Sequence, residues 1–155
     1  MRVILEQGLL VLGCGKMGSA LLKGWIEAGV PVGSIWINDP APSDWVKSLG
    51  VKLNVGLPAA PAVVLIAVKP QIMQAALPSL RLLGEGKTLF VSVAAGVQLA
   101  GFQAILGACT PVVRVMPNTP AAVGQGISAL IGNSNATRDH LALTERLMAS
   151  VGQVV

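Results

Sequence analysis

Three glycines near the start of the chain, Gly13, Gly15 and Gly18, have the spacing of a turn that binds the phosphates of a dinucleotide. In such a turn the first glycine makes the tight bend out of a strand, the second lets backbone approach the pyrophosphate, and the third lets helix and strand pack closely. The helix that follows would point its free N–H groups at the phosphates. A purely structural turn is the alternative, because a chain with 18 glycines can produce this spacing by chance.

A carboxylate, Asp39, follows the next apolar run, residues 34–38. In a dinucleotide site a carboxylate at this position accepts a hydrogen bond from the adenine ribose 2′-OH and repels a 2′-phosphate. No arginine follows it to hold such a phosphate, although Lys16 or Lys47 could still neutralise one. The residue types around Asp39 therefore favour NADH over NADPH.

Apolar runs separated by turn residues predict strands that alternate with helices. The expected strands are residues 9–12, 34–38, 51–53, 62–68, 88–93, 111–116 and 127–131, with another beginning at 152–155. The expected helices run from the glycine turn to residue 29 and over residues 43–49, 70–83, 97–106 and 137–150. Ser43 and Thr137 are expected to cap two of these helices.

This alternation predicts an α/β fold, a doubly wound, mainly parallel Rossmann-type sheet with helices on both faces. Residues 62–68 are apolar at every position, as in a central strand that is covered on both faces. Right-handed crossovers bring the loops after successive strands to one edge of the sheet. Those loops, GCGKMG, NDPAP, AVKPQ, VAAG and MPNTP, are rich in small residues and prolines and suit a flat, extended ligand.

The composition allows one domain with a sizeable core, since the chain has 155 residues and is 53% hydrophobic. Residues 88–113 carry no charge and are long enough to span a bilayer. Glycines, glutamines and a change of pattern within them indicate a buried strand, helix and strand instead. Glu6 interrupts an apolar N-terminal stretch that faintly imitates a lipoprotein signal. A cytoplasmic protein is therefore expected.

Cysteine and histidine positions predict no metal site, because Cys14 and Cys109 lack the spacing of metal ligands. Cys14 occupies a turn position at which the backbone matters most, and Cys109 is expected to be a buried apolar filler. His140, the only histidine, is expected to be a solvated surface residue without a chemical role. The net charge of +4 comes from scattered residues, and aromatics are 3%, so no nucleic-acid partner is expected.

Four segments in order, GCGKMGSAL at 13–21, AVKPQ at 67–71, VSVAAGV at 91–97 and RVMPNTPAAVGQG at 114–126, resemble the pyrroline-5-carboxylate reductases. The resemblance spans nearly the whole chain but only the N-terminal cofactor domain of that family. Its members continue into an all-helical C-terminal domain that builds the dimer and supplies much of the substrate pocket. The resemblance implies that residues 1–155 are the dinucleotide-binding domain and that a homo-oligomer forms only with the missing domain.

The resemblance further implies hydride transfer from NADPH or NADH to the C=N carbon of 1-pyrroline-5-carboxylate, giving L-proline in proline biosynthesis. By motif, the residues expected at the cofactor are Leu12, Gly13, Cys14, Gly15, Lys16 and Met17 at the pyrophosphate, Asp39 at the adenine ribose, Ala67, Val68, Lys69 and Pro70 along the cofactor, Val93, Ala94 and Ala95 near the nicotinamide ribose, and Asn118 near the nicotinamide. For Ala67 and Val68, and for Ala94 and Ala95, packing at the strand ends is the alternative role.

No side chain in these segments is a convincing proton donor, so the catalytic residues stay unknown. Arg114 is expected to be structural rather than a substrate clamp, and Lys69 is expected to act through its backbone. An imine reductase needs mainly orientation and a dry site, with the proton arriving from water or from the missing domain.

Other functions stay open. One is a different small reductase, such as an F420-dependent NADP reductase or a β-hydroxyacid dehydrogenase relative, and another is a non-catalytic nucleotide-binding module. The chain is best interpreted as a fragment of the reductase, an NAD(P)-dependent oxidoreductase that on its own binds cofactor weakly and reduces almost nothing.

Overall fold

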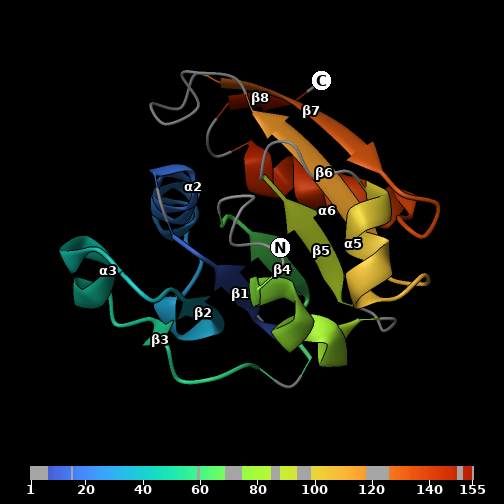
Figure 1. Ribbon diagram of the computed structural model, residues 1–155. Helices are drawn as coiled ribbons and strands as arrows, with labels where there is room; N and C mark the ends of the chain where they lie inside the picture. The colour runs from blue at the N-terminus through green and yellow to red at the C-terminus, as the bar shows by residue number, and fades with distance from the viewer. Residues whose placement is uncertain are drawn as a thin grey trace.

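The chain forms one sheet between two helical layers (Figure 1). The computed structural model describes residues 7–14, 16–58, 60–68, 75–84, 88–93, 99–117, 126–149 and 152–154. Within these ranges the sheet has eight strands. They are β1 (Leu9–Leu12), β2 (Ile35–Asn38), β3 (Lys52–Leu53), β4 (Val63–Ile66), β5 (Leu89–Ser92), β6 (Val112–Pro117), β7 (Gly126–Gly132) and β8 (Gly152–Val154).

The strand order is β3-β2-β1-β4-β5-β6-β7-β8. All pairs from β3 to β6 are parallel. From β1 the chain first builds outward through β2 and β3, then returns to the other side of β1 with β4 and continues in the opposite direction. This arrangement is the doubly wound, mainly parallel sheet predicted from the sequence, and its switch point lies between β1 and β4.

β7 departs from the parallel arrangement, because it pairs antiparallel with β6, whereas β8 pairs parallel with β7. Only residues 118–125 connect β6 to β7. A parallel crossover needs about a dozen residues or more, usually including a helix, so a connection of this length returns the chain antiparallel.

The α-helices within the described residues are α2 (Lys16–Glu27), α3 (Asp44–Ser48), α5 (Leu99–Leu106) and α6 (Arg138–Met148). The predicted caps of α3 and α6 are confirmed, because the side chains of Ser43 and Thr137 accept hydrogen bonds from the backbone N–H groups of Val46 and His140. A short 3-10 helix, η1 (Val32–Ser34), precedes β2. It ends at Ser34, the first residue of the predicted strand 34–38, so β2 starts one residue later than expected.

The helix expected over residues 70–83 is not α-helical at its end. Leu77–Leu83 form a 3-10 helix, η2, with Pro78 in its first turn. Proline has no N–H to donate four residues back, and its ring crowds the carbonyl there, which disfavours an α-helix at this point. The start of the expected helix, residues 70–74, lies outside the described residues.

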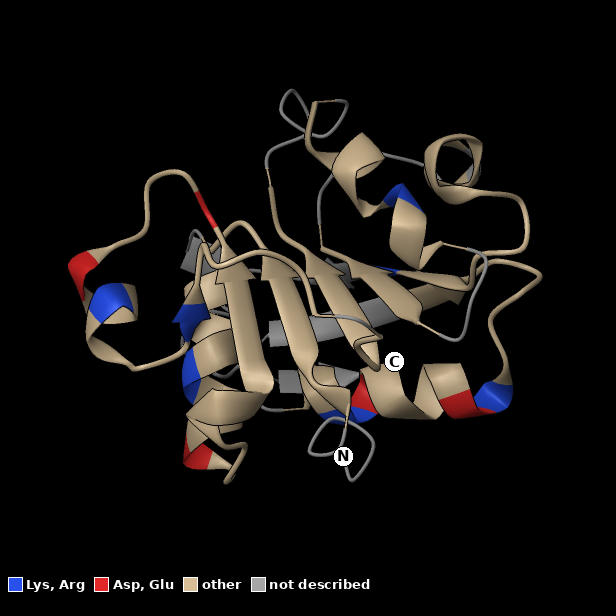
Figure 2. Cartoon of the chain, turned by 90° about the horizontal axis from the view of Figure 1, so that it is seen from below, with Lys and Arg blue, Asp and Glu red and all other residues tan. Residues whose placement is uncertain are grey.

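Two apolar clusters, one on each face of the sheet, make up the core. Alternate residues of β1 divide between them, with Leu9 and Val11 on the face covered by α2 and α6 and Leu10 and Leu12 on the face covered by α5 and η2. Figure 2 shows the charged residues mainly on helices and loops, with the strands almost entirely uncharged. Burial on both faces explains why β1 and β4 are apolar at every position.

α2 and α6 are joined beneath the sheet by the side chain of Trp25. Its indole Nε1 donates a buried hydrogen bond of 2.9 Å to the carbonyl oxygen of Leu147. The ring itself is almost completely buried, at 1% exposure. Burial of a large apolar side chain contributes about 1.5–3 kcal/mol, so this contact fixes the helix after the glycine turn against the last helix of the domain.

Cys109 is exposed, so its predicted role as a buried filler is wrong. α5 ends at Leu106, and Gly107, with φ of 110°, then turns the chain. Cys109 therefore lies in the exposed connection to β6 and not on a buried face.

His140 is half-buried, and its side chain closes the cap of α6, a role that the sequence did not predict. Its Nδ1 accepts a 3.0 Å hydrogen bond from the backbone N–H of Thr137. Burial lowers the pKa of the imidazole, and the nearby Asp139 carboxylate opposes this effect. The neutral ring thus serves as the acceptor that satisfies a free N–H at the start of α6.

Among the helices that the structure describes, none combines the length and the apolar character needed to cross a membrane. The described residues also contain no group of three or more histidine, cysteine or acidic side chains that could hold a metal ion.

Candidate functional site

The carboxyl ends of four parallel strands lie level with one another. The register aligns Asn38, Leu12, Ile66 and Ser92 in a row across β2, β1, β4 and β5. Backbone hydrogen bonds extend this alignment by one residue, from Gly13 N to Asn38 O, from Ala67 N to Leu12 O and from Val93 N to Ile66 O. The loops after these strands therefore leave the sheet at one edge, on both sides of the switch point.

Gly13 makes the tight turn at this edge, with φ of 78°. A Cβ at this position would lie 2.7 Å from Val68 Cγ1 and 3.2 Å from Val68 N. A side chain at residue 13 would thus collide with the loop after β4 as well as requiring a left-handed backbone. The structure supports the tight-turn role that the sequence predicted for Gly13.

Gly18 lets α2 approach this turn closely. A Cβ there would lie 3.3 Å from Gly13 O and 3.5 Å from the Cβ of Ala67. The close helix–strand packing that was predicted for Gly18 is therefore present. Gly15, the second glycine of the motif, lies outside the described residues.

Cys14 is buried, with 5% exposure, and its Sγ lies 3.6 Å from the Ser19 hydroxyl oxygen. Burial raises the pKa of the Cys14 thiol; the Ser19 hydrogen bond opposes this rise, and the Asp39 carboxylate adds to it. Burial thus disfavours the thiolate form that a nucleophilic cysteine needs.

The Asp39 carboxylate accepts hydrogen bonds from two backbone N–H groups. Its Oδ2 lies 2.9 Å from Cys14 N, and its Oδ1 lies 2.9 Å from Ala41 N. The first bond connects the end of β2 to the glycine turn, and the second holds the bend that follows Asp39. The sequence predicted that Asp39 lies at the adenine ribose of the cofactor. The structure adds a second role, because the hydrogen bond from Cys14 N to Asp39 also holds the glycine turn.

Asn54, which sequence reasoning missed, fixes the backbone of Asp39. Its side chain accepts from Asp39 N and donates to Asp39 O, both at 2.8 Å. Its own N–H donates to Ile37 O at 2.8 Å, and its φ is 53°. An asparagine just after a short strand was the available signal, because asparagine tolerates the left-handed region better than other non-glycine residues.

Several predicted cofactor residues lie along this edge. Ala67 and Val93 pack against the cluster under α2 and α6, and Val68 packs against the opposite cluster. Lys16 and Met17 begin α2, and only their backbone is described. The remaining predicted residues, Gly15, Lys69, Pro70, Ala94, Ala95 and Asn118, lie outside the described residues.

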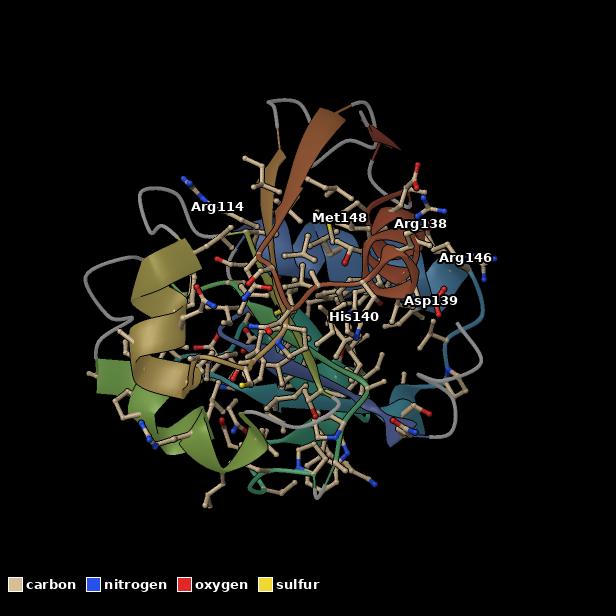
Figure 3. The ribbon with its side chains drawn as sticks, turned by 90° about the vertical axis from the view of Figure 1, so that its right-hand side faces the viewer. Arg114, Arg138, Asp139, His140, Arg146 and Met148 are labelled. Carbon is tan, nitrogen blue, oxygen red and sulfur yellow. The ribbon has the colours of Figure 1, made fainter. Side chains whose placement is uncertain are left out.

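Arg114 lies on β6 as the register partner of Ser92, at the level of the strand ends. Figure 3 shows its side chain pointing away from Met148 and α6, towards the other side of the sheet. Its Nε is buried and has no hydrogen-bond partner within the described part of the chain. The guanidinium is thus separated from the Cys14–Asp39 contact by strands β4 and β5.

Comparisons with known proteins agree with this geometry. The family described as NADP oxidoreductase, coenzyme F420-dependent, matches residues 9–96. A pyrroline-5-carboxylate reductase from Haemophilus influenzae is 34% identical over 149 residues, which cover 93% of this chain and 55% of that protein. The structure of a pyrroline-5-carboxylate reductase from Coxiella burnetii superposes with a TM-score of 0.89 at 30% identity, covering 96% of this chain and 58% of that one.

A second solved structure, the pyrroline carboxylate reductase of Plasmodium falciparum with NADP bound, has a TM-score of 0.82 at 24% identity and covers 96% of this chain and 56% of that one. At that identity the likeness shows the fold alone. The chain spans about half the length of the curated relatives it matches.

Proposed function

This chain belongs to the family described as NADP oxidoreductase, coenzyme F420-dependent, and we propose that it is the dinucleotide-binding domain of a pyrroline-5-carboxylate reductase. In this role it binds NADH or NADPH at the edge formed by Leu12, Gly13, Ala67 and Val93. The reaction is hydride transfer from the nicotinamide to the imine carbon of 1-pyrroline-5-carboxylate, which gives L-proline.

One observation supports this proposal most directly: the glycine turn lies at the switch point of the sheet. Ligands of doubly wound sheets bind outside the carboxyl ends of the strands at the switch point. Here Gly13 directly follows β1, and its missing side chain lets the turn lie against Val68 after β4. α2 begins at Lys16, so its first N–H groups lie next to the turn, where a pyrophosphate is favourably bound.

The chain's own residues supply binding and orientation. Burial disfavours the thiolate form of Cys14, and we assign the role of proton donor to none of the residues described at the strand ends. When it is bound, the nicotinamide cofactor supplies the hydride. A second, helical domain provides much of the substrate pocket in this proposal, and the proton comes from water or from that domain. The cytoplasmic location, the absence of nucleic-acid partners and the homo-oligomer stay predictions.

Dinucleotide titration tests the proposed binding site, and a turnover assay tests separately whether catalysis needs a second domain. We expect the chain to bind NAD(H) or NADP(H) in calorimetry and to oxidise almost no NADH in the presence of 1-pyrroline-5-carboxylate. With NADH or NADPH as hydride donor, a protein that extends through the helical domain should reduce this substrate in preference to β-keto acids or oxidised F420. Absence of dinucleotide binding would contradict the site, and robust proline formation by residues 1–155 alone would contradict the two-domain requirement.

Replacing Asp39 should change the choice between the two dinucleotides. The wild-type carboxylate disfavours a 2′-phosphate, and Lys47, whose Nζ lies 4.0 Å from Asp44 Oδ1, is already near another carboxylate. In Asp39→Asn we expect the ratio of NADP to NAD affinity to rise by about tenfold, the scale of 1.4 kcal/mol. Calorimetric titration with both dinucleotides measures the ratio. A wild-type chain that binds NADP more tightly than NAD would contradict this reading of Asp39.

A further inference from the structure

A chain of hydrogen bonds runs from the end of β3 to the glycine turn. Asn54 binds both backbone polar groups of Asp39, and the Asp39 carboxylate accepts from Cys14 N. Three segments that are far apart in the sequence are thereby held together. The sequence motifs of the site include Asp39 and Cys14 but do not include Asn54.

The side chain of Asn54 acts here as a strand partner would. The backbone N–H and C=O of Asp39 meet the two ends of one amide, each at 2.8 Å, just beyond the last residue of β2. Parallel pairing of β2 with β3 covers only Trp36 with Lys52 and Ile37 with Leu53. The amide therefore continues the hydrogen bonding of the sheet past the point at which β3 ends.

We propose that Asn54 is a positioning residue for dinucleotide recognition, which acts through Asp39 on the glycine turn and on the choice between NAD and NADP. This inference rests on the proposed function of the site. With its backbone held by Asn54 and its oxygens held by Cys14 N and Ala41 N, the Asp39 carboxylate cannot swing away from a ligand. A fixed negative charge discriminates against a 2′-phosphate more strongly than a mobile one, because it does not relax away from the repulsion.

The two backbone N–H groups that donate to the Asp39 carboxylate leave acceptor capacity on both of its oxygens. Each carboxylate oxygen has two lone pairs, and among the described residues one N–H group donates to each. A ribose hydroxyl can therefore donate to Asp39 without displacing Cys14 N. The same carboxylate can hold the turn and take part in recognition.

Asn54→Gly is the sharpest variant, because glycine adopts φ of 53° without strain and removes only the side-chain amide. Asn133→Gly is the matched control. The Asn133 side chain also bridges a backbone N–H and a C=O, those of Val112 and Thr110, at 3.2 and 2.8 Å. These contacts lie at the amino end of β6, away from the edge that carries Asp39.

Titration of the wild-type chain and both variants with NAD+ and NADP+ tests the inference. In Asn54→Gly we expect NAD+ affinity to fall by about three- to tenfold, the scale of lost hydrogen bonds, and the preference for NAD+ over NADP+ to shrink by at least about threefold. In Asn133→Gly the NAD+ affinity and the preference for NAD+ over NADP+ should both match wild type, although the stability of this variant falls. A merely structural role for Asn54 would lower stability without changing the ratio.

Hydrogen exchange at the Cys14 amide, followed by NMR without ligand, gives a second measurement. Asn54→Gly should accelerate this exchange several-fold relative to the strand amides of β4, and Asn133→Gly should not. An unchanged affinity ratio together with unchanged Cys14 exchange would overturn the inference. A wild-type chain that binds neither dinucleotide would overturn the proposed function instead, whatever the exchange data show.

Discussion

Gly13→Ala is expected to lower dinucleotide affinity by about a hundredfold or more, corresponding to roughly 2.7 kcal/mol. The new Cβ would meet Val68 at three atoms, at 2.7 Å from Cγ1, 3.2 Å from N and 3.3 Å from Cα. Rotation of the valine side chain relieves only the first contact, because the other two atoms belong to the backbone. The turn must therefore shift away from β4, and the N–H groups that would face the pyrophosphate shift with it.

Gly29→Ala separates this steric effect from backbone strain. Gly29 also has a positive φ, 102°, but a Cβ there would meet nothing within 4 Å. We expect this variant to lose about 1 kcal/mol of stability from the left-handed conformation alone and to bind dinucleotide as wild type does. Calorimetry of both variants, with denaturant unfolding of each, makes the comparison. Equal affinities of Gly13→Ala and wild type would contradict the turn as a binding element.

Gly84→Ala is expected to cost about 3–5 kcal/mol of stability, which is above the usual range of about 0.5–3 kcal/mol for single substitutions. Its Cβ would overlap the carbonyl oxygen of Leu106 and lie 3.2 Å from Arg81 O. Both neighbours are backbone groups at the ends of α5 and η2, so no side chain can move to make room. The two elements must separate, which opens the cluster that contains Leu83, Phe102 and Leu106.

Gly33→Ala is the control for this second prediction, because a Cβ at Gly33 would contact nothing within 4 Å. Its stability should stay within about 0.5 kcal/mol of wild type. The free energy of unfolding of each variant, from urea or guanidinium titration, measures the difference. A Gly84→Ala chain as stable as Gly33→Ala would contradict the close approach of η2 to α5.

Local signals predicted most of the fold. The strand near residues 62–68 was recognisable because it is apolar on both faces, and β4 occupies its centre at Val63–Ile66. The caps at Ser43 and Thr137 were recognisable because a hydroxyl immediately before a helical pattern satisfies a free N–H. The glycine turn was recognisable because its spacing lies between an apolar strand and a helix. Each of these features depends only on residues that are neighbours in the sequence, so the local sequence pattern is enough to predict it.

The features that sequence reasoning missed depend on partners far away in the chain. Asn54 acquires its role from Asp39, and the direction of β7 depends on how the chain returns to β6. The exposure of Cys109 follows from the turn that ends α5, whereas its residue type alone suggested burial. In the cap of α6 the imidazole of His140 takes the place of the Glu or Gln side chain that usually accepts from the N-cap N–H. A histidine at this position does not by itself indicate such a role.

The hydrogen bond between Trp25 and Leu147 has a consequence for the order in which the domain can be completed during synthesis. The indole N–H of the helix next to the glycine turn finds its acceptor 122 residues later in the chain. Until the ribosome has released that acceptor, docking α2 onto the sheet would bury a donor without a partner, at a cost of about 1–3 kcal/mol. The helix after the glycine turn therefore reaches its final stability only after the segment that contains Leu147 has been synthesised.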